Sequence, residues 1–171
     1  HLHFDHSGGC TKLNRSGDAV PIYPKARHII QEKCWIEAVS PNERFQTIFH
    51  KDDFMPLEEK GLIELVDGDS EIAPGVTLKV ADGPSKGHQM VLVDMGSERV
   101  VFASDLIPTS HHLQANFIAA ADEFPNETLV QKKELIDMAM REGWIIVFGH
   151  GQEHRSGYVE EWNGRPHLLP K

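Results

Sequence analysis

The first nine residues carry an unusual density of side chains that can bind metal ions. The segment His1-Leu2-His3-Phe4-Asp5-His6-Ser7-Gly8-Gly9 places three imidazoles and a carboxylate within six residues. His1 and His3 are two residues apart, so in an extended segment they point the same way. Asp5 and His6 follow where the chain must turn, and the two glycines permit that turn. Such a cluster predicts a site that holds two metals side by side, with some ligands on each.

A histidine-rich start can also be a cloning remnant or a solvated loop. A tag keeps its histidines in one tract, whereas the eleven histidines of this chain are scattered along it. Several of them stand next to Gly or Asp in turn-like contexts, where ligand and catalytic residues tend to lie. The sequence therefore favours a metal site.

The elements that must position these residues are predicted from hydrophobic patterning. A mostly β middle with helices between the strands predicts sheet layers covered by helices. The Asn163-Gly164 pair predicts a tight hairpin near the end of the chain. Strands are predicted over Ala19–Tyr23, Arg27–Lys33, Leu62–Val66, Val76–Val80, Gln89–Asp94, Arg99–Ala103, Trp144–Phe148, Tyr158–Trp162 and His167–Leu169.

Helices are predicted from capping residues and apolar stripes. Asp52–Lys60 has Asp52 or Asp53 as its expected N-cap and Gly61 as its terminator. Glu127–Arg141 has the best apolar stripe, with Asn126 or Thr128 expected to cap it and Gly143 to stop it.

Composition limits the classes of function and partner. The chain has 171 residues, enough for one domain, with 40% hydrophobic and 25% charged residues. No apolar run approaches the ~20 residues of a membrane helix. A net charge of −9 without a basic stripe opposes binding to nucleic acid or to anionic membranes. We therefore expect a small-molecule substrate, with neither nucleic acid nor membrane as a partner.

The two cysteines, Cys10 and Cys34, are too few for a disulfide framework. A single bridge would be compatible with this number, but we expect two free thiols in a reducing compartment, which favours the cytoplasm. No signal peptide is visible, although the chain begins at His1 and not at Met.

His1-x-His3-x-Asp5-His6 resembles the HxHxDH signature of the metallo-β-lactamase superfamily. The resemblance implies an α/β (α+β) fold, the αββα sandwich, with a dinuclear site at one edge of its two sheets. It also implies three later ligands in a set order, and the chain offers one in each place: His88, Asp105 and His150. Each of these residues taken alone would more simply be a surface or capping residue.

The sequence contexts of the three later residues fit the family unequally. Asp105 ends the run Val100–Asp105, which contains most of the predicted strand Arg99–Ala103, and His150 follows the apolar run Ile145–Phe148. His88 ends a glycine turn, but Pro84-Ser85-Lys86 stands where several relatives have His-Thr-Pro. The motif before His88 is thus recognisable but altered.

The resemblance implies a ligand set and a reaction. His1, His3 and His88 would bind the first metal; Asp5, His6 and His150 the second; and Asp105 would bridge the two. Imidazoles and carboxylates suit Zn²⁺, but Fe, Mn or Co would also fit. A hydroxide bridging the metals would attack a carbonyl or phosphoryl centre, with Asp5 steering the nucleophile or accepting its proton. Asp5 and Asp105 are therefore the predicted catalytic carboxylates.

A narrower resemblance follows Asp105. The segments Asp105–His112 and Ala121–Pro125, with Thr128, are similar to the branch that contains N-acyl-homoserine lactonases and methyl-parathion hydrolase. This implies lactones, related esters or phosphotriesters as substrates, with His111 or His112 facing the substrate unless they are only polar loop residues. Two other functions stay open: an iron-dependent redox or thiol enzyme on the same scaffold, and a non-catalytic, incomplete module.

The family fold normally has further strands before its signature, whereas the sequence begins directly at the signature with His1. We therefore expect residues 1–171 to be a single metallo-β-lactamase-like domain that is incomplete at its N-terminal end. Apolar sheet faces left uncovered would threaten a fold of marginal stability. The expected remedy is a homo-oligomer or a complementing N-terminal segment.

Overall fold

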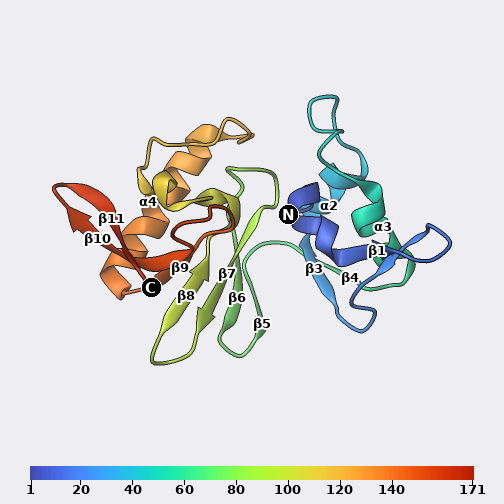
Figure 1. The fold of residues 1–171 in the computed structure, drawn as a ribbon, viewed down its shortest axis with the longest axis horizontal. Helices are drawn as coiled ribbons and strands as arrows, with labels where there is room; N and C mark the ends of the chain where they lie inside the picture. Colours follow the sequence, from blue (N-terminus) through green and yellow to red (C-terminus); the bar gives the residue numbers. More distant parts are fainter. The chain divides into compact units, whose positions relative to one another are not determined.

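The structure is a computed structural model that describes residues 1–171, and the chain divides into two units, His1–Asp67 and Gly68–Lys171. Figure 1 shows the elements of each unit along the chain. The fold is of the α/β class, as predicted, with two small two-stranded sheets in the first unit and a seven-stranded sheet in the second.

The first unit is built from short elements around an aromatic core. Strands β1 and β2 form an antiparallel hairpin, and β3 and β4 pair in parallel. One cluster of buried apolar residues contains Leu2, Ile30, Cys34, Ala38, Phe45, Phe49 and Phe54. The elements are α1 (Phe4–Ser7), the 3₁₀ turn η1 (Gly8–Cys10), β1 (Thr11–Leu13), β2 (Ala19–Pro21), β3 (His28–Gln31), α2 (Glu32–Val39), α3 (Lys51–Glu59) and β4 (Ile63–Val66).

Helix α3 begins one residue before its predicted start, and its predicted cap is wrong. The N-cap is His50, which makes no side-chain capping bond, while Asp52 and Asp53 lie in the first turn. Carboxylates in that turn interact favourably with the exposed N–H groups of the helix, so they stabilise it without capping it. Gly61 follows the helix with a φ of +64°, and it ends α3 as predicted.

The second unit is one mixed sheet with a long helix against it. The strand order is β11-β10-β9-β8-β7-β6-β5, and only β8 and β9 pair in parallel. A parallel pair needs a long crossover, and the segment that contains α4 (Pro125–Glu142) supplies it. The strands are β5 (Ser70–Ala73), β6 (Val76–Val80), β7 (Gln89–Asp94), β8 (Arg99–Phe102), β9 (Ile145–Val147), β10 (Ser156–Trp162) and β11 (Arg165–Pro170).

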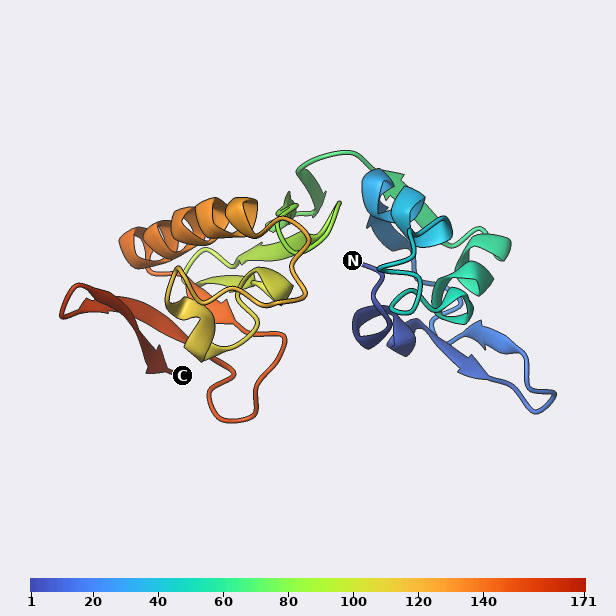
Figure 2. The same ribbon diagram turned by 90° about the horizontal axis from the view of Figure 1, so that it is seen from above.

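Helix α4 covers one face of this sheet, as Figure 2 shows. Its buried Leu135, Ile136 and Ala139 belong to the same apolar cluster as Val101 and Ile146 of the central strands. The helix starts two residues earlier than predicted, because Pro125 occupies its first turn and Phe124 is the N-cap. The predicted caps Asn126 and Thr128 are therefore wrong. Gly143, in the left-handed conformation at φ +68°, ends the helix as predicted.

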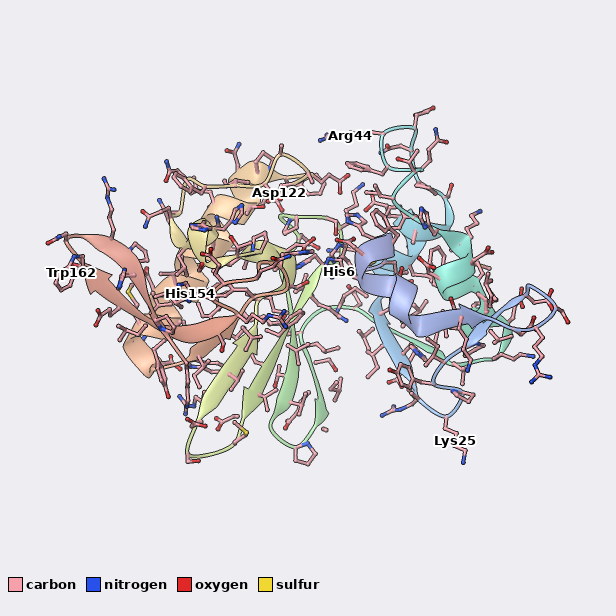
Figure 3. All side chains as sticks on the ribbon, viewed as in Figure 1. His6, Lys25, Arg44, Asp122, His154 and Trp162 are labelled. Carbon is pink, nitrogen blue, oxygen red and sulfur yellow. The ribbon has the colours of Figure 1, made fainter.

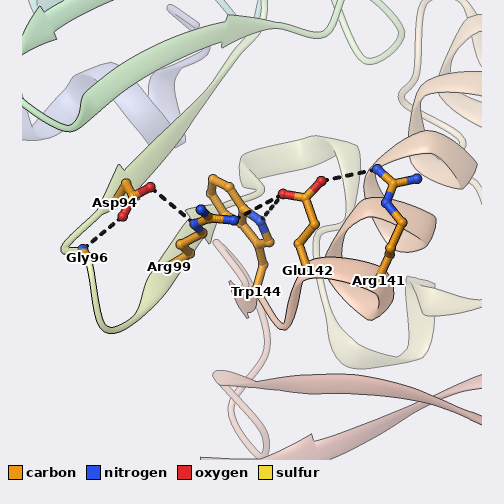
Figure 4. Close-up of polar contacts among 6 residues, drawn as sticks. All are labelled: Asp94, Gly96, Arg99, Arg141, Glu142 and Trp144. Carbon is orange, nitrogen blue, oxygen red and sulfur yellow. Dashed lines mark hydrogen bonds and ion pairs between the residues drawn. The ribbon is translucent and has the colours of Figure 1, made fainter.

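Polar contacts tie the β7–β8 hairpin to the end of α4. Arg99 donates from Nε to Asp94 Oδ2 at 3.1 Å and from a terminal nitrogen to Glu142 Oε2 at 3.3 Å (Figure 4). The indole N–H of Trp144 donates to the same carboxylate oxygen of Glu142 at 3.1 Å. Glu142 also accepts a hydrogen bond from Arg141 at 3.1 Å. The bond from Trp144, followed by the bond from Arg141, lowers the pKa of Glu142. Because the side chains of Asp94, Arg99 and Glu142 are accessible to solvent, the ion pairs among them contribute little to stability.

Two expectations from composition can be compared with the structure directly. Cys10 and Cys34 are both free thiols, as predicted, and burial raises the pKa of each. No helix has the length and apolar character needed to span a membrane.

Gly83 starts the turn that leads to His88, and it packs directly on helix α4. A Cβ at this position would lie 2.4 Å from the backbone nitrogen of Thr128 and 2.4 Å from its Oγ1. Because backbone cannot swing aside, we expect Gly83→Ala to lower the free energy of unfolding by about 1–3 kcal/mol. Gly9→Ala is the matched control, since nothing lies within 4 Å of its Cβ position. Urea denaturation measures both; equal stabilities would show that the turn is not close-packed.

Candidate metal centre

The first four candidate ligands are positioned by one turn of helix. His3 precedes α1 in an extended conformation, and its carbonyl oxygen accepts the N–H groups of His6 and Ser7, both at 2.9 Å. The buried Ser7 hydroxyl lies 3.2 Å from the carbonyl oxygen of Leu2 and 3.1 Å from that of His3. The chain therefore turns through helix α1, and not through a special conformation of the glycines. Gly8 has a φ of −59°, which any residue can adopt.

Within this unit the three imidazoles converge. The ring centroid of His1 lies 4.3 Å from that of His3 and 4.1 Å from that of His6. The carboxylate of Asp5 completes the group, with Oδ2 3.5 Å from Nε2 of His6. We call His1, His3, Asp5 and His6, the last labelled in Figure 3, the N-terminal ligand cluster. Three imidazoles and a carboxylate at such separations have the chemistry to hold Zn²⁺ or another divalent transition metal.

The second unit contributes an Asp–His pair at one edge of its sheet. Asp105 lies in the 3₁₀ turn η2 (Ser104–Leu106), three residues after β8, and His150 lies three residues after β9. Because β8 and β9 are parallel neighbours, their carboxyl ends meet at one edge of the sheet. Nε2 of His150 lies 3.0 Å from Oδ1 of Asp105, and the side chains are 41% and 21% exposed. This Asp105–His150 pair also suits a metal.

His88 contacts the backbone of the same Asp105. The residue is completely buried, and its Nε2 accepts a hydrogen bond from the backbone N–H of Asp105 at 3.1 Å. That nitrogen thus contacts the backbone of Asp105. The role of His88 as a metal ligand stays a prediction.

The two candidate substrate residues lie in the 3₁₀ turn η3 (Ser110–Leu113). His111 is exposed, whereas His112 is half-buried, with Nδ1 2.8 Å from the hydroxyl of Thr109. Burial, followed by the positive charge of Lys132, lowers the pKa of His112. A role of either histidine in substrate binding stays a prediction.

A buried polar cluster beside η3 was not predicted from the sequence as a unit. Lys132 on α4 is fully buried and donates from Nζ to the carbonyl oxygen of Phe117. Thr128, one turn earlier, donates to Oδ2 of Asp122 at 2.5 Å, and burial raises the pKa of Asp122. Asp122, labelled in Figure 3, lies in the loop that precedes α4. The sequence signal that could have revealed the burial of Lys132 is its spacing, because Lys132 lies four residues from both Thr128 and Ile136 and so shares their face of the helix.

Burial of Lys132 has a consequence for the pH dependence of stability. It lowers the pKa of Lys132 from 10.5 to about 8, with Asp122 opposing the shift. Below pH 8 the ammonium is protonated in both states; between about 8 and 10.5 the unfolded chain binds more protons, so stability should rise with pH. Lys132→Met should remove this rise, whereas the exposed control Lys133→Met should keep it. Urea unfolding at pH 7, 8, 9 and 10 measures the difference, and identical slopes would refute it.

The α/β fold and the two sets of imidazole and carboxylate donors define a protein equipped to bind metals. The family model of the metallo-beta-lactamase superfamily matches residues 1–150, a range that starts at His1 and ends on His150. The chain therefore belongs to the metallo-beta-lactamase superfamily.

Individual relatives are consistent with this family. An N-acyl homoserine lactonase from Bacillus cereus is 31% identical over 163 residues, which cover 92% of this chain and 56% of the relative. A probable metal-dependent hydrolase from Staphylococcus aureus has a TM-score of 0.83 at 25% identity, covering 93% of this chain and 55% of that one. An N-acyl homoserine lactone hydrolase with N-hexanoyl-L-homoserine at its catalytic metal centre has a TM-score of 0.67 at 26% identity, covering 88% and 53%.

The chain thus spans little more than half the length of these relatives.

Proposed function

We propose that the protein is a metal-dependent hydrolase that opens a lactone or cleaves a related ester. The observation that carries this proposal is the convergence of three imidazoles and a carboxylate in the N-terminal ligand cluster. Support comes from the relatives, of which one is named a lactonase and another binds a lactone-derived product at its catalytic metal centre.

The proposed metal centre draws on both sets of ligands. His1 and His3 would bind the first divalent metal, and Asp5, His6 and His150 the second, with Asp105 shared between the two. Zn²⁺ suits this donor set best, because zinc combines readily with imidazole nitrogen and carboxylate oxygen. The same ligands accept Fe, Mn or Co, so the metal is a matter for experiment.

When bound, two such cations would activate water and polarise the ester carbonyl. Side chains of the protein would accept the proton, orient the ligands and contact the substrate. The carboxylate of Asp5 is 41% exposed, so it is accessible to accept a proton from the attacking water. Before metal binds, Asp105 would hold the orientation of the His150 imidazole, whose Nε2 lies 3.0 Å from its Oδ1. His112, fixed against Thr109 at 2.8 Å, would contact the substrate from η3.

The charge of the protein favours neutral esters as substrates. A net charge of −9 repels anionic esters, whereas lactones and phosphotriesters carry no charge on the reacting group. Lactones are the main proposal, because the Bacillus cereus relative is named an N-acyl homoserine lactonase. Phosphotriesters share the electrophilic, uncharged centre and are the second substrate class to test.

The test uses the full-length, metal-loaded protein with N-acyl homoserine lactones of increasing acyl length, a neutral phosphotriester and a β-lactam. We expect metal-dependent ring opening of the lactones, measured by proton release, with at most slow turnover of the β-lactam. Absence of lactone and phosphotriester hydrolysis with Zn²⁺, Mn²⁺, Co²⁺ and Fe²⁺ alike would contradict the proposal.

A further inference from the structure

His88 is held firmly by its own backbone. It follows Gly87, whose φ of +64° closes the turn, and its carbonyl oxygen accepts the N–H of Ala81 at 2.8 Å. Its own N–H donates to the carbonyl oxygen of Ser85 at 3.1 Å. The side chain is completely buried, so the ring cannot turn to a new direction without repacking its surroundings.

The direction of the hydrogen bond between His88 and Asp105 fixes the state of the ring. A backbone N–H can only donate, so Nε2 of His88, 3.1 Å from the nitrogen of Asp105, is the acceptor. The lone pair of Nε2 is then engaged by this N–H, and the neutral ring carries its proton on Nδ1. A metal requires a nitrogen lone pair directed at it, and in this arrangement neither ring nitrogen provides one.

The turn that receives this bond needs support. Ser104 has a φ of +49°, a conformation that is costly for a residue with a side chain. Within the turn, the N–H of Leu106 reaches the carbonyl oxygen of Ala103 at 3.2 Å, so the N–H of Asp105 takes its partner from outside. His88 is that partner, and the turn it supports carries the carboxylate that lies 3.0 Å from His150.

We infer that His88 is a positioning residue that fixes the Asp105 turn, and that the metal centre takes its ligands from the other six predicted residues. The statement about ligands rests on the proposed function, whereas the statement about the Asp105 turn does not. His1, His3 and Asp105 would then be available to hold the first metal, and Asp5, His6, His150 and Asp105 the second, so the first metal would be held less firmly.

The wild-type protein provides the first test, which needs no variant. Histidine ¹⁵N resonances of the metal-free protein should show His88 as a neutral ring with its proton on Nδ1. Adding Zn²⁺ should move the resonances of His3 and His6 to metal-bound values and leave both nitrogens of His88 in place. A proton on Nε2, or a metal-bound shift at either nitrogen of His88, would overturn the inference.

Two substitutions separate a positioning role from ligation. The amide oxygen of His88→Gln can still accept the N–H of Asp105 but is a poor zinc ligand, whereas His88→Leu can do neither. We expect His88→Gln to keep Zn²⁺ affinity within about threefold and His88→Leu to lose about 10–100-fold, as for other groups that orient ligands. The exposed His167→Gln is the control. Equal losses in the Gln and Leu variants, matching His3→Gln, would make His88 a ligand.

Failure of the proposed function remains distinguishable from failure of this inference. If the protein bound no metal, the metal-dependent hydrolase would be refuted. The amide proton of Asp105 would still report on His88 in the metal-free protein. Its hydrogen-bonded chemical shift should persist in His88→Gln and disappear in His88→Leu; a shift unchanged in both variants would refute the positioning role.

Discussion

Replacing Asp105 with asparagine is expected to reduce the proposed lactone hydrolysis by at least about 100-fold and to weaken metal binding, because an anionic group that would be shared by two cations becomes neutral. The substitution is nearly isosteric, and an amide oxygen can still accept a hydrogen bond from His150, whose Nε2 lies 3.0 Å from Oδ1 of Asp105. The backbone N–H that His88 accepts is also unchanged. The variant therefore tests the charge of Asp105 with little change in local structure.

The measurement compares initial rates and metal content in wild type and variant. Asp137→Asn is the matched control, because Asp137 is an exposed carboxylate on α4. The metal-free Asp105→Asn protein should unfold within about 1 kcal/mol of wild type, which excludes misfolding as the cause. Wild-type hydrolysis in this variant would show that Asp105 does not bridge the metals.

The strands of the second unit were predictable because their signals are local. Asn163 and Gly164 both adopt positive φ, +51° and +73°, as a tight hairpin turn requires, and the β10–β11 hairpin forms around them. Strand β5 (Ser70–Ala73) was missed, because four residues that directly follow a turn signal show too little alternation to identify a strand. Its pairing with β6 is what makes it a strand.

The cap predictions failed for a different reason. Short polar residues were available at both helix starts, yet the N-caps are His50 and Phe124. Polar side chains near a helix start can act either at the cap or in the first turn, and residue type alone does not decide between the two. The bounds of α3 and α4 were therefore predicted to within two residues, but not the residues that cap them.

In the candidate site, too, local relations between residues were predictable and relations set by tertiary packing were not. Spacing was enough to predict that His1 and His3 converge, because two residues apart in an extended segment is a local relation. Spacing could not reveal which ring nitrogen of His88 faces which group, since that depends on a turn seventeen residues away. Lys132 was missed because a lysine in a helix is usually exposed, and only the packing of α4 buries this one. The single domain predicted over residues 1–171 stays a prediction.

Removing metal from the loaded protein is expected to abolish hydrolysis and to lower the unfolding temperature. The N-terminal ligand cluster brings three imidazoles and a carboxylate together, and a cation that binds only the folded state stabilises it. At a free metal concentration one hundred times the dissociation constant, this stabilisation is about 2.7 kcal/mol.

Dialysis against a chelator, followed by metal analysis, activity assay and calorimetry, provides the measurement, and adding back single metals identifies the one that works. Zn²⁺ has no redox chemistry, so recovery of activity with Zn²⁺ supports hydrolysis and disfavours the iron-dependent redox alternative. Recovery with iron alone, accompanied by thiol oxidation or oxygen consumption, would favour that alternative. Full hydrolytic activity after complete metal removal would contradict a metal-dependent mechanism, whatever the ligands.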